Sequence, residues 1–237
     1  EWDFGDGAFS DELSPVHLYE DVGLFDVSLI GTSDSGCVST YLDSVRIFSL
    51  PTATVVGFEN VCVGSVPQTV NFVGANGEAP YSFTYTINDG PILVVESIGD
   101  TAIIVFPTDV ATTFEVDLLY VSEVGGNTCG QEQLVTVSGT INPLPDGIIE
   151  SSAIVCVDDD FPVLSLVGSN ATAPHFFTYN ISGGADIVVE SVDEDSAFVA
   201  VPTDVAGTYQ YNLTFVEESS ETTCSSVLND SVIIVVN

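Results

Sequence analysis

The sequence contains no lysine, no methionine, one arginine and one tryptophan. Against that single arginine stand 35 Asp and Glu residues, so the formal net charge of the 237-residue chain is −34 at pH 7. Such a surface repels nucleic acid and anionic lipid, and neither is expected as a partner. The chain also lacks any run of roughly 18 apolar residues, so no membrane insertion is expected.

The carboxylates are spread along the chain and are not collected in a tail. Ten lie in residues 1–50, ten in 51–145 and fifteen in 146–237. Apolar residues still make up 45% of the chain, which is enough for packed cores. Two interpretations stay open: a solvated surface that keeps the protein in solution, or carboxylates that converge on Ca²⁺. The best local Ca²⁺ candidates are Asp158, Asp159 and Asp160, and no cofactor is required in either case.

A long internal repeat organises residues 62–237. The segment CVGSVPQTVNFVGANGEAPYSFTYTINDGPILVVES (62–97) aligns with CVDDDFPVLSLVGSNATAPHFFTYNISGGADIVVES (156–191) at an offset of 94. Further on, PTDVA at 107–111 aligns with PTDVA at 202–206, and the offset is then 95. We expect the one inserted residue to lie in a turn between two strands. A match of this length indicates two copies of one module.

Each copy has the pattern of β-structure. Segments rich in Val, Ile, Thr, Tyr and Phe lie at 69–73, 81–87, 92–97, 101–106, 113–122 and 133–141, with turn residues such as Gly125-Gly126-Asn127 between them. The run YSFTYTI alternates as a strand with one buried face must. About seven short strands in about 90 residues predict an all-β fold of tandem immunoglobulin-like β-sandwich domains, arranged as beads on a string. Residues 141–145, which include two prolines, are expected to form an extended linker.

Residues 1–50 carry a different pattern. It begins with WDFGDG at 2–7, continues with Pro15, His17 and Tyr19, and closes with GLFDVSL at 23–29. This pattern resembles the second half of a polycystic kidney disease (PKD) domain, which is itself an immunoglobulin-like sandwich. The resemblance implies a structural role for His17 and two or three further strands upstream of Trp2. The expected domains are therefore the C-terminal half of a PKD-like domain at 1–50, an immunoglobulin-like repeat 1 at 51–145 and a repeat 2 at 146–237.

The five cysteines follow the same organisation. Cys37 and Cys129 each lie 13 residues before a residue that precedes a proline, Leu50 and Asn142, and Cys224 lies 13 residues before Asn237. Pairing within each copy predicts the disulfides Cys62–Cys129 and Cys156–Cys224. Cys37 is then expected to bond to a cysteine that lies before Glu1 on a longer chain, of which these 237 residues are one part.

Two alternatives to this pairing stay open. A Cys129–Cys156 disulfide would have to span the strand at 133–141, which carries the chain roughly 30 Å, whereas disulfide Cα atoms lie within about 7 Å of one another. The other alternative is buried free thiols. Disulfides would place the protein outside the cytosol.

Few residues offer chemistry. His175 stands where repeat 1 has Tyr81, so it need not be a ligand, and the cysteine spacings do not match a zinc site. Arg46 is the only permanently cationic side chain, and the protein is not expected to be an enzyme. Four triplets of Asp, Ser or Thr, and a small aliphatic residue resemble the O-glycosylation signal of secreted Bacteroidota proteins. Their middle residues are the glycosylation candidates Thr101, Ser196, Ser44 and Ser231.

PKD-like and cysteine-bounded repeats on proline linkers resemble the giant surface adhesins of gliding Bacteroidota, which the type IX secretion system exports. The resemblance implies a stalk segment of an extracellular, filamentous cell-surface protein whose partners are neighbouring repeats of the same chain. Adhesive contacts with polysaccharide or other surface ligands would then come from loops or other domains. Two other interpretations stay open: accessory domains of a secreted multidomain hydrolase, and a carbohydrate-binding module. The second is disfavoured because Trp2, the one tryptophan, belongs to the PKD-like pattern.

Overall fold

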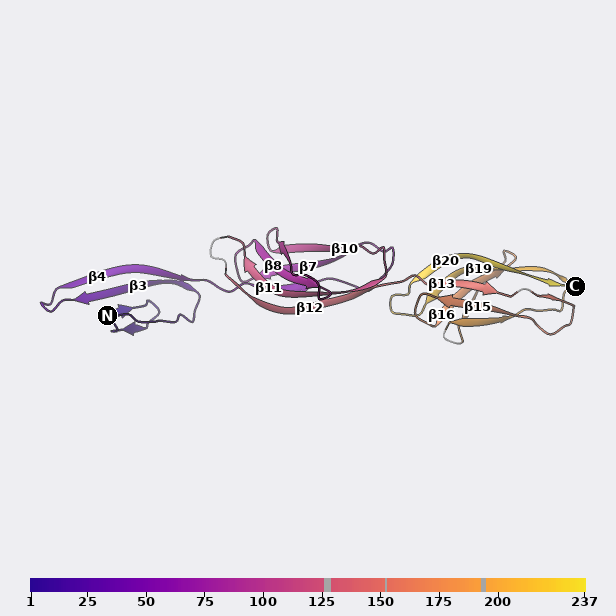
Figure 1. The fold of residues 1–237 in the computed structure, drawn as a ribbon, viewed down its shortest axis with the longest axis horizontal. Helices are drawn as coiled ribbons and strands as arrows, with labels where there is room; N and C mark the ends of the chain where they lie inside the picture. The colour runs from indigo at the N-terminus through magenta and orange to yellow at the C-terminus, as the bar shows by residue number, and fades with distance from the viewer. Residues whose placement is uncertain (126–128, 152, 193–194) are drawn as a thin grey trace. The chain divides into compact units, whose positions relative to one another are not determined.

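The computed structural model describes residues 1–125, 129–151, 153–192 and 195–237, and all regular structure in these ranges is β (Figure 1). Nothing in the described ranges forms a helix that could cross a membrane. Residues 1–50 contribute β1 (Trp2–Asp3), β2 (Phe9–Ser10), β3 (Gly23–Thr32) and β4 (Val38–Ile47). Repeat 1 contributes β5 (Thr52–Val56), β6 (Val61–Cys62), β7 (Gln68–Ala75), β8 (Tyr81–Ile87), β9 (Leu93–Glu96), β10 (Thr101–Phe106), β11 (Thr112–Glu123) and β12 (Gly130–Asn142). Repeat 2 contributes β13 (Asp146–Glu150), β14 (Ile154–Val155), β15 (Val163–Ser169), β16 (His175–Ile181), β17 (Ile187–Glu190), β18 (Ser196–Ala200), β19 (Gly207–Glu218) and β20 (Ser225–Val236).

Strand pairing in the described ranges gives five sheets, and each lies within one of the three expected domains. Their orders are β2-β1-β3-β4, then β10-β7-β5 with β6-β12-β11-β8-β9, then β13-β15-β18 with β14-β20-β19-β16-β17. The two repeats therefore share one topology, a three-stranded and a five-stranded sheet, which is that of tandem immunoglobulin-like β-sandwiches.

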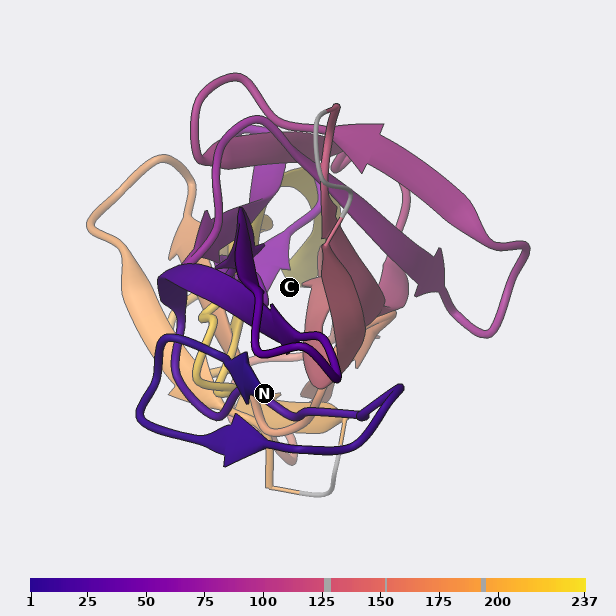
Figure 2. The same ribbon diagram turned by 90° about the vertical axis from the view of Figure 1, so that its left-hand side faces the viewer.

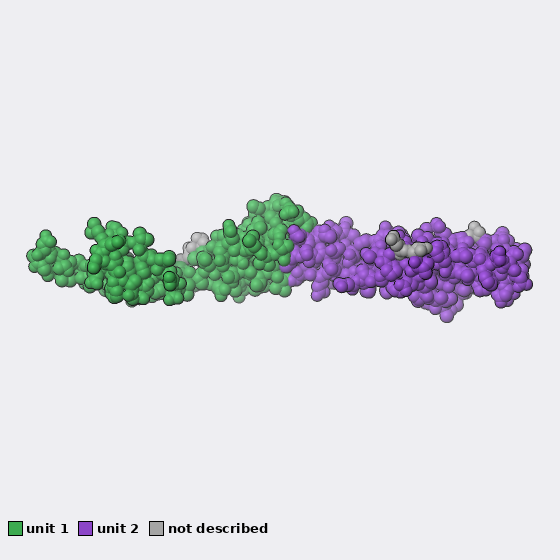
Figure 3. Space-filling model, turned by 90° about the horizontal axis from the view of Figure 1, so that it is seen from below, with its two compact units in different colours: residues 1–56, 71–103, 116–136 green, residues 57–70, 104–115, 137–237 purple. Residues whose placement is uncertain are grey.

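The chain's two compact units follow a different division, with unit 1 formed by 1–56, 71–103 and 116–136 and unit 2 by 57–70, 104–115 and 137–237 (Figure 3). This division runs through repeat 1, and the domain boundaries at 50/51 and 145/146 stay a prediction.

Unit 1 begins with the single sheet of residues 1–50. Figure 2 faces this end of the chain and shows its short indigo strands beside the N-terminus. The long hairpin β3–β4 pairs in continuous register from Gly23↔Ile47 to Thr32↔Val38. Nine of the ten residues of β4 are exposed, so this strand contributes little to a core. The unit also holds part of repeat 1, where Phe72 packs against Phe83 and Tyr85 at ring-centroid distances of 5.5 and 5.1 Å.

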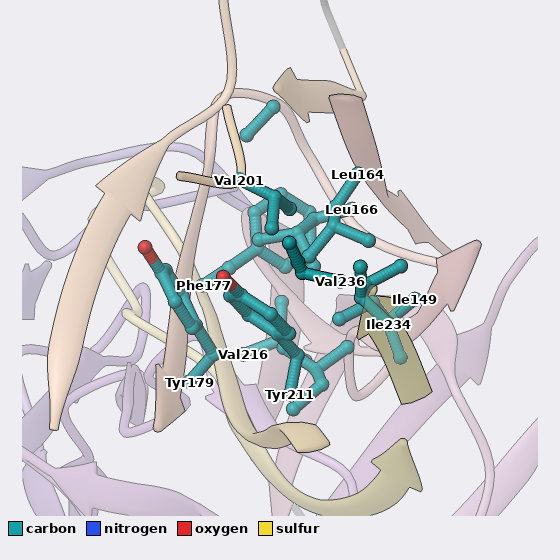
Figure 4. Packing of buried hydrophobic residues seen from close by; sticks show 12 residues of the cluster. Ile149, Leu164, Leu166, Phe177, Tyr179, Val201, Tyr211, Val216, Ile234 and Val236 are labelled. Carbon is teal, nitrogen blue, oxygen red and sulfur yellow. The ribbon is translucent and has the colours of Figure 1, made fainter. Parts of the chain in front are cut away.

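Unit 2 contains the whole of repeat 2, whose core draws on both of its sheets. The alternation HFFTYNI in β16 turns Phe177 and Tyr179 inward, as period-two strand geometry requires. Leu164 and Leu166 reach the same core from β15, and the labelled side chains point toward one another in Figure 4. The part of repeat 1 in this unit is held by three phenylalanines whose rings lie 4.5 to 5.6 Å apart: Phe58, Phe106 and Phe114.

The strands β7 to β12 agree closely with the six expected segments of repeat 1 and differ from them only at their ends. The short strands β5 and β6, and their counterparts β13 and β14, were not expected, so each repeat has eight strands among the described residues. The linker predicted at 141–145 is wrong in its first two positions, because β12 runs to Asn142 and Ile141 is 1% exposed. Only residues 143–145 lie between β12 and β13. The turn residues Gly126 and Asn127 and the region of the one-residue insertion near 193–194 lie outside the described residues.

His175 is fully buried at the start of β16. Among the described residues neither of its ring nitrogens has a hydrogen-bond partner. Asp195 Oδ1 lies 3.7 Å from Nδ1, which is too far for a hydrogen bond. Tyr81, the equivalent residue of repeat 1, instead donates its hydroxyl to the Gly77 carbonyl at 2.8 Å. At this position repeat 2 therefore buries two polar atoms without hydrogen bonds, whereas the polar atom of repeat 1 is hydrogen-bonded.

The substitution His175→Tyr is expected to raise the free energy of unfolding of repeat 2 by about 1–2 kcal/mol, because a bonded hydroxyl replaces two buried unpaired nitrogens. The larger ring has room, since Gly168 faces His175 as Gly74 faces Tyr81. The midpoint of urea unfolding measures the change. The reverse exchange Tyr81→His in repeat 1 is the matched control and should lower the midpoint. A lower midpoint for His175→Tyr would contradict the unpaired state of the histidine.

Candidate functional site

Cys62 ends the short strand β6 and begins a tight turn. Its strand runs parallel to the end of β12, with Cys62 opposite Asn142, and the Val63 N–H donates to the Asn142 carbonyl at 2.9 Å. Gly64 follows in a left-handed conformation (φ +81°), and its N–H donates to the Thr108 carbonyl at 2.9 Å. The turn is thus held by β12 and by Thr108, which fixes the direction of the Cys62 side chain.

Cys224 lies in the loop before β20 and is 1% exposed. A buried carboxylate organises this loop: Glu218, 2% exposed, accepts hydrogen bonds from the Ser220 hydroxyl at 2.7 Å and from the Cys224 N–H at 3.3 Å. Its other oxygen accepts the Thr172 N–H at 3.0 Å. The donors that surround Glu218 supply the hydrogen bonds that a buried carboxylate requires.

A disulfide joins these two loops. Cys62 and Cys224 are bonded with a Cα–Cα distance of 5.6 Å, across a sequence separation of 162 residues. Beside the bond, the Asn142 side-chain amide donates to the Thr222 hydroxyl at 2.9 Å. The Cys62 Sγ lies 3.9 Å from the Thr222 carbonyl oxygen, a contact without a hydrogen bond because a disulfide sulfur carries no hydrogen. We call this set, Cys62, Cys224, Asn142 and Thr222, the disulfide joint; it connects a residue of repeat 1 with a loop of repeat 2.

The predicted pairs Cys62–Cys129 and Cys156–Cys224 are therefore wrong. In repeat 2, Cys156 follows Val155, which pairs with Val236 at the end of β20, whereas Cys224 directly precedes the start of β20. A twelve-residue strand at about 3.3 Å per residue separates them by roughly 40 Å, and a disulfide allows about 7 Å between Cα atoms. The same holds in repeat 1, where Cys62 lies at the end of β12 and Cys129 before its start.

Cys37, Cys129 and Cys156 are free in the structure. Cys37 directly precedes β4, as Cys129 precedes β12 and Cys224 precedes β20, so its expected equivalence to those two cysteines agrees with its place in the fold. Its bond to a cysteine upstream of Glu1 stays a prediction. The sequence reasoning did not identify Asn142, Thr222 or Glu218 as parts of a site. The internal repeat offered one indication, because Asn142 and Asn237 occupy equivalent positions, as do Glu123 and Glu218.

Two of the three calcium candidates, Asp158 and Asp159, form part of the turn that follows Cys156. The Asp159 carboxylate accepts the Cys156 N–H at 2.8 Å, and Asp158 takes a left-handed conformation (φ +66°). Within residues 1–125, 129–151, 153–192 and 195–237, no three His, Cys, Asp or Glu side chains, Asp160 included, are grouped so that they could hold a metal ion. The structure thus does not bring Asp158, Asp159 and Asp160 together as a Ca²⁺ site.

The four glycosylation candidates lie on strands. Thr101 and Ser196 begin the equivalent strands β10 and β18 and are half-buried, whereas Ser44 and Ser231 are exposed within β4 and β20. In two of the triplets the Asp carboxylate accepts the N–H of the following serine, at 2.8 Å for Ser44 and 2.9 Å for Ser231. Glycosylation at these four residues stays a prediction.

The PKD-like residues form one aromatic stack. Phe4 and His17 lie parallel with ring centroids 4.1 Å apart, Tyr19 meets His17 edge-on at 4.7 Å, and Phe25 stacks on Tyr19 at 4.6 Å. Tyr19 also donates its hydroxyl to the Phe4 carbonyl at 3.0 Å. The WDFGDG turn requires glycine at Gly5, whose φ is +79° and where a Cβ would come within 2.5 Å of a backbone oxygen. His17 is thus part of a packed stack, which is the structural role implied by the resemblance.

Comparison with known proteins gives one family match. A PKD domain model matches residues 1–47. Over 35 residues the chain is 54% identical to the collagenase ColQ1 of Bacillus cereus (strain Q1), a match that covers 15% of this chain and 4% of the collagenase.

Similar folds occur among solved structures, and the three described here share 12–13% sequence identity with the chain. A 1.5-MDa bacterial ice-binding adhesin, studied for its retention on the host cell surface, is 12% identical with a TM-score of 0.39, over 90% of this chain and 75% of that one. Extracellular cadherin domains 3–6 of protocadherin gamma B2 are 13% identical with a TM-score of 0.37, over 90% and 57%. Fibronectin(III)-like modules of Clostridium thermocellum CbhA are 12% identical with a TM-score of 0.33, over 78% and 94%. These likenesses concern the fold alone.

A PKD-like module, immunoglobulin-like repeats and a disulfide are together typical of extracellular proteins.

The disulfide joint predicts a thiol count. The chain has five cysteines, of which two are bonded, so thiol titration of the unfolded, non-reduced 237-residue protein should find three free thiols. Pairing within each repeat would leave one. Non-reducing peptide mapping with a glutamate-specific protease should recover Cys62 linked to Cys224. Recovery of Cys62 linked to Cys129 would contradict the joint.

Asp6 provides a pH-dependent observable in the PKD-like turn. The Ala8 N–H, and after it the His17 side chain, hold the pKa of the Asp6 carboxyl below its usual 3.8. Because the folded pKa is the lower one, this stabilising contribution is present above pH 3.8 and is lost as the pH falls through the folded pKa. Carboxyl-detected NMR should show the low pKa, and His17→Ala should move it part of the way back. Identical titrations in both proteins would show that His17 has no effect on Asp6.

Proposed function

We propose that residues 1–237 are a stalk segment of a long, filamentous, extracellular cell-surface adhesin of the kind used in gliding motility or surface attachment. The observation that carries the proposal is the disulfide joint. Cys62 lies in repeat 1 and Cys224 in repeat 2, 162 residues apart, so the bond ties one module to the next in addition to residues 143–145. A covalent cross-link between consecutive modules suits a stalk, because a stalk must keep the domains at its two ends apart.

Composition supports the same proposal. A net charge of −34 spread over all three domains makes neighbouring modules and neighbouring molecules repel one another. The absence of lysine and the single arginine leave almost no sites for trypsin-like proteases. Both properties favour a segment that stays separate and intact outside the cell.

The proposal assigns adhesion to other parts of the molecule. The partners of this segment are neighbouring repeats of the same chain, and extracellular polysaccharide or other surface ligands are bound through other domains. Export by a type IX secretion system, as in gliding Bacteroidota, and O-glycosylation at the four candidate triplets belong to the same proposal. The proposal includes neither nucleic acid nor anionic lipid as a partner, since the negative charge of the chain repels both.

The first test is the size and place of the native protein on its source cells. Antibodies raised against the 237-residue chain should label filaments that extend from intact cells, and the reactive species should have a mass many times 24.9 kDa. Cells that lack the gene are the control for labelling. A soluble native species near 24.9 kDa, with no label on the cell surface, would overturn the proposal.

The competing function is that of accessory domains in a secreted multidomain hydrolase. The match over 35 residues to a collagenase favours it specifically. Protease and glycosidase assays on the same native preparation separate the two, because hydrolysis that co-purifies with the full-length molecule would support the accessory role. We propose no catalytic role for residues 1–237 themselves. In support, the lone arginine, Arg46, stacks on Phe48 with 4.9 Å between the guanidinium carbon and the ring centroid.

A further inference from the structure

The free cysteine Cys156 lies in a turn that repeats the turn of the bonded Cys62. The Val157 N–H donates to the Asn237 carbonyl at 2.8 Å, as Val63 does to Asn142 at 2.9 Å. Each turn is closed by a hydrogen bond to the carbonyl of its cysteine. The Ser65 N–H donates to the Cys62 carbonyl at 3.1 Å, and the Asp159 N–H donates to the Cys156 carbonyl at 3.2 Å. Each cysteine lies at the end of a short strand that runs parallel to the last strand of its repeat: Cys62 is the last residue of β6, and Cys156 directly follows β14.

The next residue of the two turns agrees as well. Gly64 has φ +81° and Asp158 has φ +66°, both left-handed. Their N–H groups donate to equivalent carbonyls, Gly64 to Thr108 at 2.9 Å and Asp158 to Thr203 at 3.1 Å. The threonine hydroxyls then bond back to the turn. Cys156 is therefore held in the backbone setting that Cys62 has in the disulfide joint, but it is exposed and unbonded.

The other residues around the disulfide joint also have equivalents in the second copy of the repeat. Asn142 donates to Thr222 beside the Cys62–Cys224 bond, and Asn237 occupies the equivalent position beside Cys156. At the other pole of the repeat, the Glu123 N–H donates to the Cys129 carbonyl at 2.9 Å, as Glu218 does to Cys224 at 3.0 Å. Each repeat thus carries a Cys62-type turn at one end of its last strand and a Cys224-type loop at the other.

We propose that Cys156 forms a disulfide with the Cys224-equivalent cysteine of a further repeat of this kind joined to Asn237. The equivalent cysteine, Cys62, makes this bond in the same structure, and the turn, the asparagine and the exposed thiol are in place to repeat it. In forming the bond, the two thiols lose two protons and two electrons to a low-molecular-weight disulfide such as oxidised glutathione, which leaves as two thiols. The proposal does not depend on the stalk function, since accessory domains of a hydrolase could be tied in the same way.

The test appends a second copy of residues 143–237 directly after Asn237 of the full 237-residue chain. Asn237 then precedes the appended proline as Asn142 precedes Pro143. The extended protein has seven cysteines, and oxidation in a glutathione buffer should leave three free thiols, because two disulfides form. Alkylation of Cys156 in the native protein should fall at least tenfold relative to the parent chain. Peptide mapping should recover Cys156 linked to the appended Cys224 equivalent.

The control is the same extended protein with Cys156→Ser, which should have four free thiols and an unchanged Cys62–Cys224 bond. Five free thiols in the extended protein, with Cys156 fully alkylated, would overturn the proposal while the original bond remains. Recovery of Cys156 only in an intermolecular dimer on a non-reducing gel, or linked to another cysteine of its own repeat, would overturn it as well. None of these outcomes bears on whether the native molecule is a surface filament.

Discussion

The length of the last strand in each repeat keeps the two cysteines of that repeat apart. β20 is twelve residues long and pairs antiparallel with β19 over most of its length, while its final residues pair in parallel with β14. A strand of this length has two distant ends, and a cysteine is positioned at each of them. Because a strand cannot bend back on itself, those two cysteines cannot meet, and each is available only to something outside its own sandwich. The covalent connectivity follows from this geometry.

In so acidic a chain, the carboxylates are stabilised by hydrogen-bond donors that carry no positive charge. With one arginine for 35 carboxylates, ion pairs cannot neutralise the surface. Several carboxylates instead accept backbone N–H groups: Asp3 from Gly5, Asp159 from Cys156, and Asp230 from Ile149. Such bonds to a charged acceptor are stronger than neutral ones. They also shape turns, so part of the negative charge contributes to the local structure as well as to solubility.

Strand positions could be predicted from the sequence because alternation and β-propensity are local properties. YSFTYTI and HFFTYNI show their buried faces directly, and the observed β8 and β16 match them. The two-residue strands β6 and β14 carry no such pattern, since pairing alone defines them. Without β6, nothing in the sequence shows that Cys62 lies beside the end of β12.

The disulfide was mispredicted for that reason. Spacing suggested a bond within each copy, and the strand length that argued against Cys129–Cys156 also argues against Cys62–Cys129. Proline likewise suggested a linker that began too early, because Ile141 and Asn142 lie before the first proline and still belong to β12. Tertiary pairing, which the sequence does not display, decided both cases.

The disulfide joint changes how the chain would respond to a pull on its two ends. The shortest covalent path from Glu1 to Asn237 leaves the backbone at Cys62 and rejoins it at Cys224, so tension bypasses the residues between them. At about 3.4 Å per extended residue, the 162-residue separation corresponds to roughly 550 Å of contour length that cannot be drawn out even if the sandwiches unfold. In a chain cross-linked in this way, the residues inside the closed loop can unfold without lengthening the covalent path between the two ends, and they can refold while the ends are still under tension.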